Sequence, residues 1–317
     1  MYIAFAPMQG YTDAVYRRAH YECVGGVEEY YTPFARLDGD APRAKDLRDT
    51  DPERNAGVPT VPQVIARDVN EFARLCDALQ EQSWRRIDLN MGCPFPMQVR
   101  AGSGSGLLQH PDRVEAICDE MLRRPGVGFS IKMRLGQEGS GECISLLPII
   151  NDMPLVHVTL HPRLGQQQYK GEADREAFSH FYEVCKHPIV YNGDISSMED
   201  AEALLQRFPS LKGVMMGRGL LARPWMLSCR QNAGDPQHAQ NDAFGRQLIA
   251  DTPQKVMKEM HAIVYRHDTE TLCGDSQILA RLHAFWEYLD IDRKAKKAIL
   301  KATTLPRYRE AVASALR

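Results

Sequence analysis

Cys93 is the residue whose sequence surroundings point most directly to chemistry. It stands between Gly92 and Pro94 in the run DLNMGCP, residues 88–94, directly after a segment of strand character. A free cysteine usually packs as a small hydrophobic residue, whereas this one is held on a tight turn just past a strand end. No metal-ligating residues surround it in the sequence. The roles left for the thiol are nucleophile and general acid.

Two glycine-containing runs have the composition of a phosphate-binding site. The first is Asn192-Gly193 and the second is Gly217-Arg218-Gly219. Glycine lets the backbone approach an anion closely, and a guanidinium group can donate a bidentate pair of hydrogen bonds. The structural alternative is a pair of tight turns with a surface arginine. We expect phosphate binding to a group smaller than a dinucleotide on its own domain, because no Gly-x-Gly-x-x-Gly run follows a strand.

Lys132 lies in another strand-like run, within IKMRLG at residues 131–136. A cation in that position can face the electron-rich edge of a flavin, and Gln63 can satisfy other polar positions of the same ring. Two other interpretations remain open at this point. Lys132 can be a Schiff-base lysine, or it can be the partner of Asp88 or another carboxylate.

The elements that must position these residues form a repeating pattern. Short apolar runs rich in β-branched residues alternate with longer segments of helical period, as in repeated βα units on a parallel sheet. Eight such runs span residues 2–8, 29–35, 61–66, 86–91, 128–134, 155–161, 188–192 and 213–216. Eight strands with mostly helical crossovers predict an α/β fold, a (β/α)8 TIM barrel, in preference to an open doubly wound sheet.

The predicted strands end in polar residues that a merely structural barrel would not need. Because the active site of a TIM barrel lies at the carboxyl ends of its strands, these residues should meet there. In strand order, the residues at these ends, most of them polar, are Pro7 and Met8; Gln63; Asn90 and Cys93; Lys132 and Arg134; His161 and Arg163; Asn192, Gly193 and Asp194; and Gly217 and Arg218.

Signals for helices and loops lie between these strands. Apolar residues recur at helical spacing over residues 114–122 and nearly so over residues 198–208. N-cap residues stand at Asp68, Asp174 and Ser197, the last in a capping-box-like run with Asp200 in place of Glu. Two long segments, 36–60 and 135–154, show little period and are expected to be loops. The glycine-rich run 101–106 lacks a P-loop ending and is expected to be a mobile loop over the site.

The pattern changes near residue 235. The polar run QNAGDPQHAQ, residues 231–240, has linker composition, and Thr252-Pro253 is an N-cap followed by proline at the first helical position. Beyond it, Ile278, Leu282, Phe285, Trp286 and Leu289 form an amphipathic stripe without a strand nearby. We therefore expect a barrel domain over residues 1–235 and an all-helical domain over residues 236–317.

Composition narrows the class of protein. The 317 residues are 44% hydrophobic and 25% charged, which is ordinary globular composition. With 39 basic and 41 acidic residues the net charge is -2, so any basic surface must be local. Without a long apolar run or a signal peptide we expect a cytoplasmic protein. The 8 cysteines form no C-x-x-C pair, so we expect reduced thiols and no metal site.

Taken together, these motifs resemble the tRNA-dihydrouridine synthase family, flavoenzymes with a TIM barrel followed by a helical domain. The resemblance extends from about residue 3 to about residue 225. The motifs that carry it are APMQGYTD (6–13), DLNMGCP (88–94), VRAGSGSGLL (99–108), IKMRLG (131–136), NGDI (192–195) and MGRG (216–219). The helical tail matches the family in length and character only.

The resemblance implies a cofactor, a substrate and roles for the candidate residues. FMN, reduced by NADPH, would lie across the barrel mouth and give hydride to carbon 6 of a flipped-out uracil in tRNA, and Cys93 would protonate carbon 5. The implied cofactor contacts are Pro7, Met8, Gln63, Lys132, His161, Asn192, Gly193, Asp194, Gly217 and Arg218. Asn90, Arg134, Arg163 and Tyr169 are assigned to the substrate. The basic residues Lys294, Lys296 and Lys297 are assigned to the tRNA backbone.

One motif departs from the family pattern. After the sixth strand the family has H-G-R-T followed by Y-x-G, whereas this chain has His161-Pro162-Arg163-Leu164 and then Tyr169-Lys170-Gly171. Proline removes a backbone N–H and fixes φ, so position 162 could not donate a backbone hydrogen bond to a ligand.

Three other functions compete with this interpretation. The nearest is a related FMN barrel acting on a small molecule, such as a free pyrimidine or an enoate, although a small substrate needs no basic helical tail. A Schiff-base aldolase using Lys132 is the second. An RNA-binding protein without catalysis is the third. We take a monomer as the default, since neither a coiled coil nor an obvious interface stripe is evident.

Overall fold

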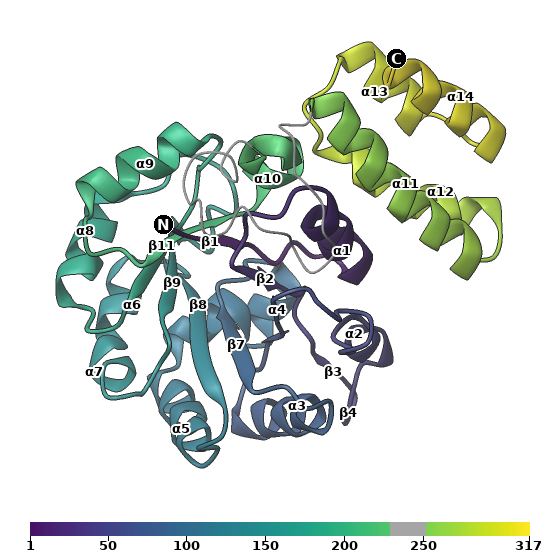
Figure 1. Cartoon of the computed structure of the whole chain (residues 1–317). Coiled ribbons are helices and arrows are strands. Elements are labelled where there is room, and N and C mark those ends of the chain that lie inside the picture. The colour runs from purple at the N-terminus through teal and green to yellow at the C-terminus, as the bar shows by residue number, and fades with distance from the viewer. Residues whose placement is uncertain (229–251) are drawn as a thin grey trace.

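Nine parallel strands, two of which are halves of one interrupted strand, form a barrel in the computed structural model, which describes residues 1–228 and 252–317 (Figure 1). The hydrogen-bonded order is β5-β2-β1-β11-β10-β9-β8-β7-β6. The strands are β1 (Tyr2–Phe5), β2 (Glu29–Tyr31), β5 (Thr60–Val61), β6 (Gln63–Val64), β7 (Arg86–Met91), β8 (Gly128–Gly136), β9 (Val158–Leu164), β10 (Ile189–Asn192) and β11 (Gly213–Met216). The predicted TIM barrel is confirmed.

Pro62 divides the third strand into β5 and β6, and the two halves close the barrel. β5 pairs with β2 while β6 pairs with β7. Proline has no N–H to donate, but its carbonyl accepts the N–H of Asp88 at 2.9 Å. On the other side, the Thr32 hydroxyl accepts the N–H of Gln63 at 3.0 Å. The interruption therefore leaves neither neighbour without a hydrogen bond.

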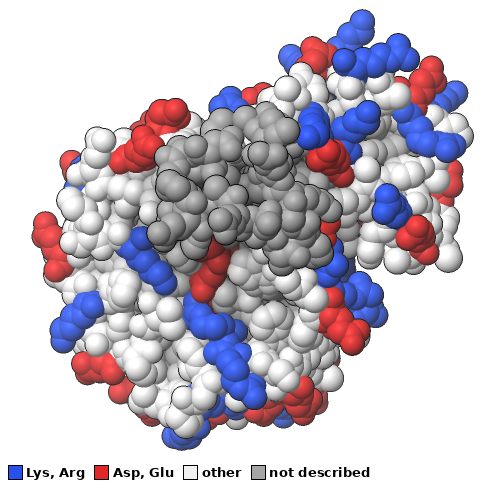
Figure 2. Space-filling view, viewed as in Figure 1, with Lys and Arg blue, Asp and Glu red and all other residues white. Residues whose placement is uncertain are grey.

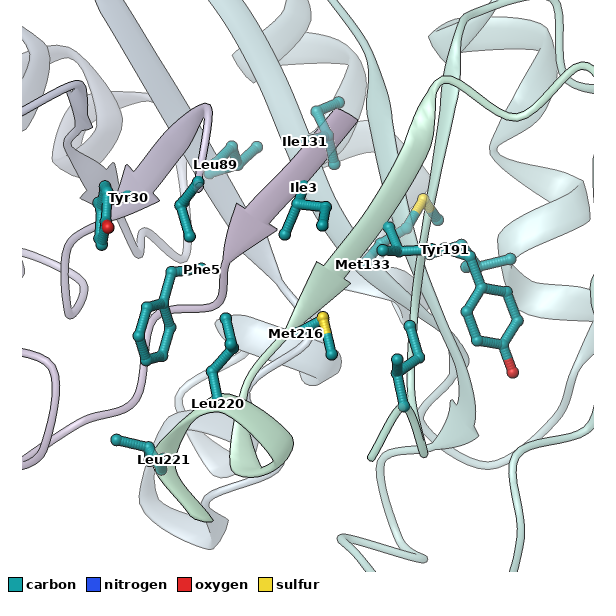
Figure 3. Packing of buried hydrophobic residues seen from close by; sticks show 14 of the residues in the cluster. Ile3, Phe5, Tyr30, Leu89, Ile131, Met133, Tyr191, Met216, Leu220 and Leu221 are labelled. Atoms are coloured by element: carbon teal, nitrogen blue, oxygen red, sulfur yellow. The ribbon is translucent and has the colours of Figure 1, made fainter. Parts of the chain in front are cut away.

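Side chains alternate between the outer and inner faces of the strands. The inner positions are apolar on some strands and polar on others. The outer face packs on the helices, and Figure 3 shows Ile3, Phe5, Leu89 and Ile131 in this layer. A small apolar cluster with Ala4, Ala6 and Met215 lies on the alternate positions. On β6 to β9 the alternate positions hold buried polar residues: Gln63, Asp88, Asn90, Ser130, Arg134, Thr159 and His161. Because side chains alternate along a strand, these polar groups share the barrel interior.

Helices surround the barrel as the sequence predicts (Figure 1). They are α1 (Ala14–Cys23), α3 (Val69–Glu81), α5 (Pro111–Leu122), α8 (Arg175–Val184), α9 (Met198–Arg207) and α10 (Arg218–Ala222). The expected N-caps are confirmed, since the side chains of Asp68, Asp174 and Ser197 each accept backbone N–H groups of the first turn. Asp200 completes the capping box with Ser197.

The expectation of loops at 36–60 and 135–154 is partly wrong. These segments contain β3 (Leu37–Asp38), β4 (Ala41–Pro42), α2 (Ala44–Asp49), α6 (Gly141–Ser145) and α7 (Leu147–Ile150). Helices of four to six residues complete too few turns for an apolar period to be visible in the sequence.

The glycine-rich run 101–106 is not a mobile loop, and this prediction is also wrong. It leads from α4 (Pro96–Arg100) into a buried 3-10 helix, Gly104–Gln109, that packs below the Cys93 turn. A Cβ added at Gly104 would lie 2.5 Å from the carbonyl oxygen of Cys93. The glycine therefore serves close packing beneath Cys93 and not mobility.

The helical domain contains α11 (Pro253–Thr271), α12 (Asp275–Glu287), α13 (Arg293–Leu300) and α14 (Leu305–Ala315). The Thr252 side chain caps α11 as predicted. The expected stripe is buried on and just after α12. The predicted linker, 231–240, and the domain boundary at residue 235 lie outside the described residues. Within residues 1–228 and 252–317, no helix combines the length and apolar character needed to span a membrane.

Candidate active site

A cavity of about 640 Å³ opens at the carboxyl ends of the barrel strands. Three of the residues that line it are basic, Lys132, Arg134 and Arg218, and Asp194 is the one acidic side chain among the described lining residues. The sequence-predicted residues that line the cavity are Pro7, Met8, Gln63, Asn90, Cys93, Lys132, Arg134, His161, Tyr169, Asn192, Gly193, Asp194, Gly217 and Arg218. Fourteen positions from distant parts of the sequence thus meet in one place, whose charge suits an anionic ligand.

Four sequence-predicted residues do not line this cavity. Arg163 is 2% exposed and lies behind His161. Lys294, Lys296 and Lys297 lie on α13 of the helical domain. The assignment of Arg163 to direct contact with substrate is therefore corrected, because its guanidinium is enclosed by the protein.

The Cys93 turn is held by hydrogen bonds from both sides. Asn90 Oδ1 accepts the N–H of Gly92 at 3.0 Å and that of Cys93 at 2.8 Å. The carbonyl of Cys93 accepts the N–H of Ser105 at 3.0 Å and its hydroxyl at 3.1 Å. Burial raises the pKa of the Cys93 thiol above its usual value. The group is thus a fixed, protonated thiol at the cavity wall, as a general acid requires.

A buried chain of side chains supports Asn90 from below. Asn90 Nδ2 donates to Gln63 Oε1 at 2.7 Å, and Gln63 Nε2 donates to Asp88 Oδ2 at 2.7 Å. The Ser130 hydroxyl donates to the other oxygen of Asp88 at 2.6 Å. Burial raises the pKa of Asp88 to about 6. Gln63 lines the cavity, but its amide is engaged in orienting Asn90, so Gln63 also acts as a positioning residue.

Lys132 presents an amine to the cavity. It lies at an inner position of β8, paired in register with Asn90 of β7. Within the part of the chain that the structure describes, no hydrogen bond or ion pair engages its Nζ. Burial and the neighbouring Arg134 lower the pKa of Lys132 to about 8. A direct ion pair with Asp88, which the sequence left open, is not among these contacts, although the Asp88 carboxylate still raises the pKa of Lys132 electrostatically. The amine can therefore serve a bound ligand.

Arg134 links the Cys93 turn to the loop that follows β9. Its Nε donates to the Gly92 carbonyl at 2.9 Å, and its Nη1 donates to the carbonyls of Leu164 at 2.9 Å and Gln168 at 2.7 Å. Its guanidinium also lies 5.5 Å from the ring centroid of Tyr169. Arg134 lines the cavity and at the same time fixes two of its loops.

His161 is a neutral imidazole whose tautomer is set by Arg163. Arg163 Nη1 lies 3.0 Å from His161 Nε2, and because a guanidinium can only donate, Nε2 accepts and the ring proton lies on Nδ1. Burial and the nearby cations, Arg134 foremost, lower the pKa of His161 well below its usual value. A neutral ring can offer one N–H to a ligand without adding charge.

Pro162 is accommodated by a bulge in β9. Arg134 pairs with His161 and Gly136 pairs with Leu164, so β9 has one more residue than β8 over this stretch. Proline is tolerated in strands at bulges, where no ladder N–H is needed, and its carbonyl accepts the N–H of Asp174 at 2.7 Å. Pro162 is therefore compatible with the strand, and Arg163 still contacts His161 across it.

The ends of β10 and β11 form the other side of the cavity. Gly193 has a φ of +141°, and a Cβ there would lie 3.0 Å from the His161 ring. A Cβ at Gly217 would lie 3.3 Å from Ala6 and from the Met8 sulfur. Both glycines keep backbone close to the cavity where a side chain would fill it. This cradle fits a phosphate beside Arg218.

Asp194 orients Arg218. One carboxylate oxygen accepts from Arg163 Nη2 at 2.5 Å and the other from Arg218 Nη2 at 3.3 Å. The Arg218 guanidinium also lies 4.9 Å from the Tyr169 ring centroid. A phosphate at this end would meet Arg218 and not the carboxylate, because two anions repel. Asp194, predicted as a cofactor contact, is placed as the residue that holds Arg218.

Several lining residues were missed by the sequence analysis, among them Phe34, Tyr11 and Tyr288. Tyr11 belongs to the APMQGYTD motif, which was the signal available for it. Tyr288 directly follows α12 in the helical domain and belongs to none of the motifs. Only the docking of the helical domain brings it to the barrel mouth.

Comparison with known proteins identifies the family of this chain. A family model described as dihydrouridine synthase (Dus) matches residues 4–298. A tRNA-dihydrouridine synthase B of Pasteurella multocida is 30% identical over 229 residues, covering 71% of this chain and 67% of the relative. A protein of the same name from Escherichia coli is 30% identical over 225 residues, covering 70% of this chain and 68% of the relative.

Solved structures agree on the fold. A morphinone reductase variant in complex with tetrahydroNAD matches 74% of this chain and 89% of its own, with a TM-score of 0.53 and 10% identity. Another morphinone reductase structure matches 74% and 88%, with a TM-score of 0.51 and 10% identity. The family model spans both the barrel and most of the helical domain, and the chain belongs to the dihydrouridine synthase family.

Proposed function

We propose that this protein is a tRNA-dihydrouridine synthase that uses FMN and NADPH to reduce the 5,6 double bond of specific uridines in tRNA. One observation carries the proposal. The cavity unites the Cys93 thiol, whose pKa is raised by burial, the Lys132 amine, which no hydrogen bond from the described residues engages, and a glycine-lined cradle beside Arg218. The names of the relatives support the tRNA substrate.

The cavity residues fit FMN in two regions. The cradle of Gly193, Gly217 and Arg218 would hold the phosphate, with His161 and Asn192 beside it. Pro7 and Met8 would contact the ring, and Lys132 would face its pyrimidine edge. When bound, FMN would supply the hydride for carbon 6 of the uracil, with NADPH as the source of the electrons.

Cys93 would donate the proton to carbon 5 of the uracil. Burial keeps the thiol protonated, while Arg134 and Lys132 act in the opposite direction and stabilise the thiolate that remains after the transfer. Asn90 and Gln63 would fix the direction in which the thiol points. The proton from Cys93 thus completes the addition across the 5,6 double bond.

The helical domain would bind the RNA backbone. In Figure 2, Lys and Arg side chains gather over the part of the molecule where Figure 1 places α13 and α14. Lys294 and Lys297 are exposed on α13, whereas the Lys296 amine donates to the Leu289 carbonyl at 2.8 Å. A uridine in folded RNA must leave its stack to enter the cavity, which requires a surface that binds the backbone nearby. We assign residues 1–235 to catalysis and residues 236–317 to tRNA binding, in a cytoplasmic enzyme.

The decisive experiment is mass-spectrometric mapping of dihydrouridine in unmodified tRNA after incubation with the protein, FMN and NADPH. Dihydrouridine at defined positions, dependent on all three components, is the expected result and identifies the target uridine. A yellow protein that consumes NADPH but forms no dihydrouridine in any tRNA would contradict the proposal and favour a small-molecule substrate.

A further inference from the structure

The helical domain docks on the two elements that follow β1 and β11. These strands are neighbours in the barrel, with Phe5 paired to Met216. α11 packs along α1, which follows β1, and also contacts the short 3-10 helix Pro224–Leu227 that follows α10 (Figure 1). The loop after β1 supplies Pro7 and Met8 to the cavity, and the link from β11 into α10 supplies Gly217 and Arg218. The domain interface therefore lies directly behind two walls of the site.

Tyr288 is the residue of the helical domain that forms part of the cavity wall. It lines the cavity together with Tyr11 of the barrel, and the two rings meet edge to face with centroids 4.8 Å apart. The Tyr11 hydroxyl donates to Glu287 Oε2 at 2.9 Å. The loop after β1 is thus joined to the end of α12 by both a ring contact and a hydrogen bond.

A second link joins the helical domain to α10. The N–H of Asp290 donates to the Ala222 carbonyl at 2.8 Å, and the Arg223 guanidinium pairs with the Asp290 carboxylate at 2.8 Å. α10 has five residues, so its length is about 7.5 Å. Its first residue, Arg218, and its last, Ala222, both line the cavity. If the Asp290 loop moved, α10 would move with it as one short, rigid element and would displace Arg218.

The third link acts on the start of α1. Asp13 caps α1 by accepting the N–H of Tyr16 at 3.0 Å, and it also pairs with Arg281 of α12. Arg281 in turn faces the buried Asp268 of α11 at 3.8 Å. An ion pair between domains therefore anchors the end of the loop that starts at Pro7.

We propose that the helical domain is a structural part of the flavin site, with Tyr288 as a positioning residue for FMN, in addition to any role in binding RNA. This inference rests on the proposed function, because it takes FMN as the ligand of the cavity. Tyr288 supports one wall, and the Glu287 and Asp290 contacts hold the loops after β1 and β11 in place for the ring and the phosphate. FMN binding and domain docking then reinforce each other, since coupling between two sites is reciprocal.

The test measures FMN affinity of the full-length protein in the absence of tRNA and NADPH, by quenching of flavin fluorescence. Tyr288→Ala should weaken binding about tenfold, because the substitution removes the aromatic ring and the packing behind it. Tyr288→Phe should bind nearly as the wild type does, because it keeps the ring. Glu270→Gln, at an exposed position of α11, is the control in the same domain. Thermal unfolding of each apoprotein checks that the variant is folded.

Hydrogen exchange gives the reciprocal measurement. Saturating FMN should slow exchange in α12 and in the loop at residues 288–290 of the wild type, and this protection should disappear in Tyr288→Ala. An FMN dissociation constant of Tyr288→Ala within about twofold of wild type would overturn the inference, and so would the absence of FMN-dependent protection of α12 in a wild-type protein that binds FMN. If the wild type itself binds no FMN, the proposed function is wrong. That result differs from a loss of FMN affinity in Tyr288→Ala alone.

Discussion

The side-chain oxygen of Asn90 accepts the backbone N–H of Cys93 at 2.8 Å, so a residue near the end of β7 fixes the turn that carries the thiol. The same oxygen accepts the N–H of Gly92 at 3.0 Å. The Asn90 amide nitrogen is held by Gln63 at 2.7 Å, which prevents the side chain from rotating away. The position of the proposed acid is therefore set by the buried polar interior of the barrel.

Cys93→Ala should separate the two halves of the reaction. The variant should bind FMN and accept electrons from NADPH, but dihydrouridine formation should fall by about 10² to 10⁴, because only the proton donor is removed. Stopped-flow reduction of the flavin and mass spectrometry of tRNA give the two readouts. Cys273→Ala, at an exposed cysteine between α11 and α12, is the control. Loss of FMN from Cys93→Ala would contradict the assigned role.

Asn90→Ala should slow product formation by about 10 to 100 times, because a displaced catalytic group loses the benefit of orientation. Asn90→Asp should recover part of the rate, since a carboxylate oxygen can still accept both backbone N–H groups. Single-turnover assays at saturating tRNA measure the effect on the chemical step. Equal rates for Asn90→Ala and the wild type would show that the turn holds Cys93 without Asn90.

Lys132 should make FMN binding depend on pH. Its pKa of about 8 means that the ammonium is lost as the pH rises through that value, so the FMN dissociation constant should increase from about pH 7 to about pH 9. The phosphate of FMN has a second pKa of about 6 and does not titrate in this window. Lys132→Met should bind more weakly at the lower pH and show a flat profile. Lys170→Met, at an exposed position, is the control. If Lys132→Met kept the pH dependence of FMN binding, that dependence would come from another group.

Lys294→Gln combined with Lys297→Gln should weaken tRNA binding and flatten its salt dependence. For each lysine that no longer neutralises a phosphate, the slope of log K against log salt should decrease in magnitude by about 0.7 to 0.9. Lys296 is kept, because its amine caps the Leu289 carbonyl and its removal would also affect stability. Lys258→Gln, exposed on α11, controls for net charge. An unchanged slope would place the RNA surface elsewhere.

Acidification should destabilise the fold through buried neutral histidines. Burial lowers the pKa of His20 to about 3, so the unfolded state binds this proton first as the pH falls. The stabilisation that neutral His20 gives the folded state is fully present above the ordinary pKa of histidine. Below that pKa the unfolding free energy decreases by about 1.4 kcal/mol per pH unit, until the pH reaches about 3. Relative to His20→Asn, the wild type should lose about 2 kcal/mol of unfolding free energy between pH 7 and about pH 5. Urea unfolding at both pH values measures this, with His180→Asn at an exposed position as control. Parallel pH profiles for wild type and His20→Asn would refute it.

The sequence by itself determined the features that depend on near neighbours. Strand runs, N-caps at Asp68, Asp174 and Ser197, and proline after Thr252 are local signals, and the structure confirms them. The polar strand ends were also visible, because parallel strands of a barrel bring their carboxyl ends to one side. These signals were enough to predict many of the residues that line the cavity, Cys93 and Lys132 among them.

Only the tertiary structure decided which of these groups face a ligand and which hold one another. Arg163 and Asp194 stand at strand ends, yet packing pairs them, and the glycine-rich run 101–106 is buried beneath Cys93 where the sequence indicated a mobile loop. Tyr288 reaches the cavity only because the helical domain docks on α1 and α10. Burial and partnership depend on contacts between segments distant in the chain, and a single sequence holds no local signal for them.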